Sequence, residues 1–127
     1  MITLSLLQYL EDNNIGTIDE NMFWQNLGLD AEGLYIVNIG QAQNRGQRRV
    51  QRYEIYVRME RKDLGLKMLE EVIDLIDKSY GICDLPAVQD YVDGYHNITL
   101  LPLSTPTRVG EDANGRVIWS ASGSIIY

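Results

Sequence analysis

The residues best suited to catalysis or metal binding are few in this 127-residue chain. It holds one cysteine, Cys83, and one histidine, His96, and this pair is too small for a metal site with the usual ligand spacing. Nothing in the sequence pairs the two residues as a catalytic thiol and its base, so we expect an ordinary buried or half-buried cysteine. A single cysteine also excludes a disulfide within the chain.

Carboxylates and glycines do not form a recognisable catalytic or nucleotide-binding motif. Adjacent carboxylates are numerous and include Asp19-Glu20, Glu70-Glu71 and Glu111-Asp112. Such pairs are expected by abundance in an acidic protein, and the glycines match neither the dinucleotide fingerprint nor the phosphate loop. Ser122 lies inside an expected strand rather than at the strand-to-helix turn of a nucleophile elbow. We therefore predict no enzyme activity, no metal and no cofactor.

The charge distribution is the strongest functional signal. Seven of the eleven basic residues fall in one short stretch: Arg45, Arg48, Arg49, Arg52, Arg58, Arg61 and Lys62. With only two acidic residues among them, this stretch carries +5, whereas four basic and sixteen acidic residues give the rest of the chain −12. The overall charge of −7 argues against a general nucleic-acid binder. A subunit so divided is suited to head-to-tail association.

Composition places the chain among ordinary globular domains. It is 45% hydrophobic and 23% charged, and no apolar run approaches the roughly 18 to 20 residues that span a bilayer. The opening residues lack a basic leader and a small-residue cleavage site, so we expect a protein made in the cytoplasm, with no membrane partner.

Hydrophobic periodicity predicts the secondary structure. Alternating apolar residues from Tyr53 to Met59 indicate a half-buried strand, and helical spacing from Leu66 to Ile76 indicates an amphipathic helix. Thr3 and Asp63 are the expected N-caps of two helices. The expected elements are helices over 3–12 and 63–79 and strands over 34–39, 48–61, 98–103 and 116–127.

The segments between these elements are expected to be loops. The polar segment 40–47 predicts a long hairpin loop with a basic end. The strand that follows is long enough to extend beyond its partner strand, which leaves an arm. Residues 82–94 and 104–115 are expected to be irregular, with a tight turn at Asn114-Gly115. Met22–Trp24 is expected to be a loop or short helix that places aromatic side chains in the core.

These elements predict the fold class. We expect an α+β domain with a mostly antiparallel sheet of about four strands and two helices packed on one face, in the order α-β-β-α-β-β. No repeat, low-complexity tract or linker divides the chain, so residues 1–127 are expected to form a single domain.

Four segments carry a family resemblance. They are the short helix Leu4–Leu10, the strand-to-helix unit YEIYVRMERKDLGLKMLEEVIDLID, the strand ITLLPLS and the closing motif EDANGRVIWSASGSIIY. Together they resemble the small tail-terminator and minor capsid proteins that join head to tail in long-tailed bacteriophages. The resemblance implies a ring-forming, usually hexameric virion subunit, without catalytic residues or cofactor, that stops tail-tube growth and meets the head-completion protein.

Charge and resemblance together predict where this chain makes contacts. The expected interface with a neighbouring subunit or the tail tube consists of eight charged residues: Arg45, Arg48, Arg49, Arg52, Arg58, Glu70, Glu71 and Asp74. Alternatively, the basic arm lines a lumen through which DNA passes without sequence-specific binding. Two other classes stay open: another head-tail connector or neck protein, and a host cytoplasmic adaptor or small-molecule-binding domain, which should contain a sizeable pocket.

Overall fold

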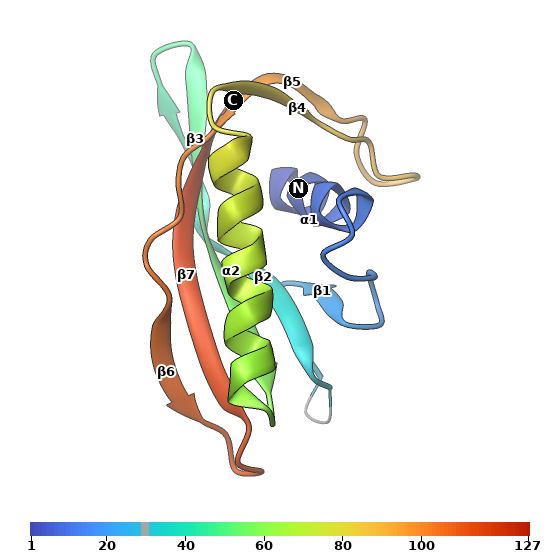
Figure 1. The fold of residues 1–127 in the computed structure, drawn as a ribbon. Helices are drawn as coiled ribbons and strands as arrows, with labels where there is room; N and C mark the ends of the chain where they lie inside the picture. The colour runs from blue at the N-terminus through green and yellow to red at the C-terminus, as the bar shows by residue number, and fades with distance from the viewer. Residues whose placement is uncertain (29–30) are drawn as a thin grey trace.

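The computed structural model describes residues 1–28 and 31–127, which form a mixed α+β fold (Figure 1). The helices are α1 (Ile2–Asp12) and α2 (Lys62–Lys78). The strands are β1 (Met22–Trp24), β2 (Gly33–Arg45), β3 (Arg48–Met59), β4 (Ile82–Leu85), β5 (Tyr95–Leu100), β6 (Thr107–Glu111) and β7 (Val117–Ile126). The expectation of about four strands was therefore wrong, because the described residues contain seven.

The strands form one curled sheet in the order β1-β2-β3-β7-β5-β4, with β6 paired to β7 below β5 in Figure 1. Only β1 and β2 run parallel, and the other strand pairs of the described chain are antiparallel. The three long strands β2, β3 and β7 lie side by side. They form the centre of the sheet, against which α2 packs (Figure 1).

Both helices contribute to a single hydrophobic core with the sheet. The predicted alternation of β3 is confirmed, because Tyr53, Ile55 and Val57 are fully buried. The buried stripe of α2 consists of Gly65, Met68, Leu69, Val72 and Ile76. Full burial of each large apolar side chain contributes about 1.5–3 kcal/mol, so this strand and helix supply much of the stabilising free energy.

Neither predicted helix N-cap has that role. Thr3 lies within α1, is completely buried, donates a hydrogen bond to Asn38 (2.6 Å) and accepts one from Trp24 (2.9 Å). Asp63 lies in the first turn of α2, where its charge favours the helix N-terminus, and it pairs with Arg61 at 2.9 Å. Thr3 therefore serves a tertiary contact, and Asp63 serves an ion pair inside the first turn rather than the N-cap position.

One physical reason explains why four strand segments were not predicted from the sequence. Residues 40–45, expected in a loop, continue β2, while 82–85 and 107–111 form short strands in segments expected to be irregular. Met22–Trp24 is a strand rather than a loop or helix. These strands are short or extend past the core, so few of their side chains alternate between buried and exposed environments. Pairing with a partner strand holds each of them in an extended conformation, and local periodicity does not reveal that partner.

Candidate interaction surfaces

A two-stranded hairpin extends beyond the core, where β2 and β3 pass the end of α2 (Figure 1). Its last pairs are Asn44 with Arg49 and Arg45 with Arg48, joined by a two-residue turn. Gly46 supplies the positive φ of 64° that such a turn favours. We call residues 43–50 the basic hairpin. It replaces the long, mobile loop that the sequence predicted, and it fixes the position of three predicted interface arginines.

Two arginines of the basic hairpin are held by their own chain. Arg48 donates to the carbonyl oxygens of Asn97 (2.8 Å) and Ile126 (3.4 Å). Arg49 lies over the ring of Tyr127, with 5.6 Å between the guanidinium carbon and the ring centroid, and the two backbones exchange hydrogen bonds. These contacts attach the hairpin to β5 and β7.

Arg45 and Arg52 differ from these two arginines. Both are exposed, and neither side chain has a hydrogen bond or ion pair with the described residues. Arg45 lies at the hairpin tip, and Arg52 lies at its base on the sheet face away from the core, opposite Ile39 and Ser124. Among the predicted interface arginines, these two are available to a partner.

Arg58 was predicted at the interface, but it is part of an internal cluster. Its side chain is 12% exposed, donates to the carbonyl oxygens of Gly28 and Ala31, and lies 3.7 Å from Asp112. Arg116 contacts the same carboxylate at 2.7 Å and donates to Ala31 at 3.2 Å. The cluster joins β3, the turn before β7 and the segment before β2, so Arg58 serves the fold.

The Asp112 carboxylate organises this turn. Burial alone raises its pKa, but hydrogen bonds from the backbone N–H groups of Arg116 and Asn114 and from the Arg116 guanidinium lower the pKa overall. Gly115 provides the positive φ of 77° in the turn. The predicted tight turn at Asn114-Gly115 is thus present, and it also positions an ionic contact.

The predicted acidic interface residues Glu70, Glu71 and Asp74 are exposed on α2. They lie away from the helix's buried stripe, and none has an ion pair with the basic hairpin in the described part of the chain. Within one subunit the structure therefore does not bring the acidic and basic groups of the predicted interface together.

The sheet face away from the helices carries two stacked tyrosines. The rings of Tyr35 and Tyr56 lie 5.0 Å apart at an interplanar angle of 16°. Tyr56 donates a short hydrogen bond to Glu54. This hydrogen bond, together with burial and the nearby negative charge, raises the pKa of Tyr56 to about 12. The aromatic pair and its carboxylate are a polar, ordered surface rather than part of the core.

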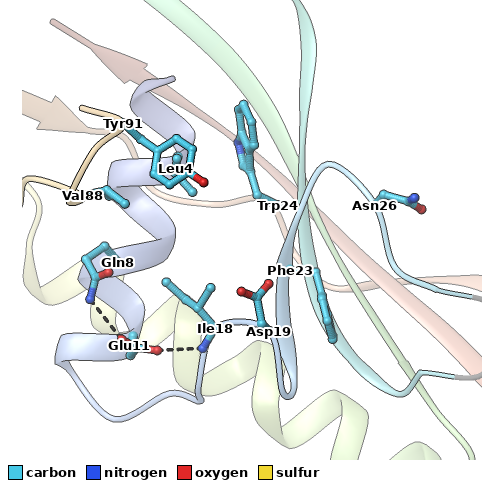
Figure 2. A pocket seen from close by; sticks show the side chains of 10 residues that line it. All are labelled: Leu4, Gln8, Glu11, Ile18, Asp19, Phe23, Trp24, Asn26, Val88 and Tyr91. Carbon is cyan, nitrogen blue, oxygen red and sulfur yellow. Dashed lines mark hydrogen bonds between the residues drawn. The ribbon is translucent and has the colours of Figure 1, made fainter.

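A groove that the sequence did not predict lies between α1, β1 and the segment 86–94 (Figure 2). Its volume is about 570 Å³. Trp24, Tyr91 and Asp19 are among the residues that line it, and Figure 2 shows their side chains. The aromatic pair Phe23-Trp24 was the one sequence signal for it. The groove depends on a loop some 65 residues further along the chain, which that signal does not reveal.

Cys83 and His96 lie on the neighbouring strands β4 and β5. Cys83 is half-buried, as expected, and burial followed by the neighbouring Asp84 charge raises the pKa of its thiol. His96 lies 3.4 Å from Asp84, and both side chains are exposed. The described residues contain no group of three or more His, Cys, Asp or Glu side chains that could hold a metal ion.

Comparison with known proteins adds no assignment: no protein-family model and no curated protein matches the chain. The helices of the described residues are all too short or too polar to cross a membrane.

Proposed function

We propose that the protein is a structural subunit of a bacteriophage particle, a ring-forming tail terminator that caps the tail tube and joins it to the head. The observation that carries the proposal is the basic hairpin, which extends from the core of an otherwise acidic subunit. Opposite charges on separate parts of one subunit favour a heterologous contact, and such contacts close into rings when the rotation permits.

The resemblance to tail terminators adds the partners. A ring, hexameric in that family, contacts the tail-tube protein on one side and the head-completion protein on the other, within the tail or neck of the virion. The exposed Arg45 and Arg52 are the proposed contact residues of the hairpin, and Glu70, Glu71 and Asp74 of α2 provide an acidic surface for a neighbour. Arg58 is removed from this set because it contacts its own chain.

Electron microscopy of the purified protein mixed with tail tubes that lack a terminator tests the proposal. We expect rings at tube ends, and light scattering after size exclusion should detect the ring when it also forms alone. The double variant Arg45→Ser/Arg52→Ser should reduce tube capping by about tenfold or more, because exposed charges steer and orient such contacts. Changing Arg48 and Arg49 as well would disturb the hairpin itself.

Lys62→Ser/Lys67→Ser is the matched control, because it removes the same charge from exposed positions on α2. It should cap tubes as the unchanged protein does. A protein that stays monomeric and leaves tube ends bare contradicts the proposal. Capping of a neck complex, but not of free tubes, would instead assign it to the head-tail connectors.

A further inference from the structure

The groove between α1, β1 and segment 86–94 combines apolar, aromatic and acidic groups. Leu4, Ile18 and Val88 line it together with the rings of Trp24 and Tyr91 (Figure 2). Tyr91 is 70% exposed, so its ring is accessible to another molecule. Aromatic faces beside a carboxylate are the chemistry that recognises a cationic side chain.

The two carboxylates of the groove have different environments. Glu11 accepts hydrogen bonds from Gln8 (3.1 Å) and from the backbone N–H of Ile18 (2.7 Å), so it holds the wall together. Asp19 is exposed, and its carboxylate has no hydrogen bond or ion pair within the described chain. It is the acidic group of the groove that can accept a partner's cation.

The segments that form the groove walls contain no lysine or arginine to balance their carboxylates. Residues 1–44 contain no lysine or arginine, and neither do residues 79–107. Further carboxylates are next to lining residues in the sequence: Asp12 follows Glu11, Glu20 follows Asp19, and Asp90 precedes Tyr91. An acidic surface formed from two such segments attracts a basic group of another molecule, at short range and at moderate salt.

The basic hairpin carries the matching group. Arg48 and Arg49 contact Asn97 and Tyr127 of their own chain, whereas Arg45 extends from the tip without such a contact. A two-residue turn makes this tip narrow. In Figure 1 the hairpin stands at the top left of the subunit, whereas α1 and β1, which line the groove, lie on the right, so a contact between the hairpin and the groove joins two copies. This is the head-to-tail arrangement that a closed ring requires.

We infer that the groove binds the Arg45 side chain of a second copy of this chain, with the guanidinium between Asp19 and the aromatic rings of Trp24 and Tyr91. The inference rests on the proposed ring and names its subunit contact. It replaces the acidic face of α2 as the surface that receives the hairpin, and leaves that face to other partners.

Charge reversal with rescue tests the contact. Arg45→Glu and Asp19→Lys should each weaken self-association about tenfold or more, measured by analytical ultracentrifugation alone and with tail tubes. The double variant Arg45→Glu/Asp19→Lys should recover part of the loss, because it restores the ion pair with its charges exchanged but not the contact between a cation and the aromatic rings. Combining Arg45→Glu with Glu71→Lys, an exposed site on α2, is the matched control and should recover nothing.

Asp19 has a positive φ of 68°, so lysine there carries backbone strain. Asp19→Asn avoids it, since asparagine tolerates this conformation, and should weaken association without changing the fold seen by circular dichroism. Rescue by Glu71→Lys, or assembly unaffected by both single changes, overturns the inference while the ring stands. An unchanged protein that stays monomeric with and without tubes overturns the proposed function as well.

Discussion

The two ends of β3 differ in what their charged residues do. From Tyr53 onward the strand is packed against α2, and its arginine, Arg58, is enclosed with Asp112 and Arg116. Before Tyr53 the strand leaves the core and its arginines meet solvent or the edge of the sheet. Residues of the same type, in one continuous strand, thus stabilise the fold at one end and present a charge to partners at the other. Burial decides which role each has.

The largest effect is expected at the enclosed end. Arg116→Ala should give the largest loss in the free energy of unfolding, because it removes the ion pair with Asp112 together with the hydrogen bonds that Arg116 donates to Asp112 and Ala31. Chemical denaturation measures this change. Arg45→Ala, at the solvent end, is the control and should stay within about 0.5 kcal/mol of the unchanged protein. Equal losses in both variants would contradict the division of the strand.

A second substitution locates the boundary between the two ends. Gly123 of β7 lies opposite Tyr53, and a Cβ there would come within 2.7 Å of the tyrosine hydroxyl and 2.6 Å of Leu103. Gly123→Ala should therefore cost about 2 kcal/mol of stability by overpacking. Ser124→Ala, opposite Arg52, should change stability by less than about 0.5 kcal/mol. Thermal unfolding compares the two, and a larger loss from Ser124→Ala would place the boundary elsewhere.

The smallest effect on stability is expected on the sheet face away from the helices. There, in the part of β3 that packs against α2, Tyr56 donates a hydrogen bond to Glu54. Glu54→Gln should return the pKa of Tyr56 from about 12 toward its ordinary value of 10, because it replaces a charged acceptor, which favours the neutral phenol, with a weaker neutral one. Absorbance titration, with Tyr56→Phe subtracted to isolate this residue, gives the value.

The same shift predicts a pH dependence of stability. A raised pKa in the folded state stabilises below pH 10, and this contribution is lost as the pH rises from 10 toward 12. Glu54→Gln should flatten that decline. An identical decline in both proteins would show that Tyr56 and Glu54 do not interact in solution.

The pattern of apolar residues was enough to predict the elements that bury one face. Alternation from Tyr53 to Met59 and helical spacing from Leu66 to Ile76 report contact with a core, so β3 and α2 were found close to their observed bounds. The Asn114-Gly115 turn was found because its backbone conformation favours those residues. Each of these signals can be read within a short window of the sequence, whether it reports a buried face or a turn.

Which arginines can meet a partner, and which are held by their own chain, depends on the tertiary structure. The sequence placed Arg58 with Arg45 in one basic stretch, but Arg58 is enclosed by residues 28, 31 and 112, which lie far from it along the chain. The strand character of 40–45 and the groove beside Trp24 likewise depend on distant segments. Hydrogen bonding across strands and burial by remote loops leave no periodic trace in the residues concerned, so their roles follow from the fold.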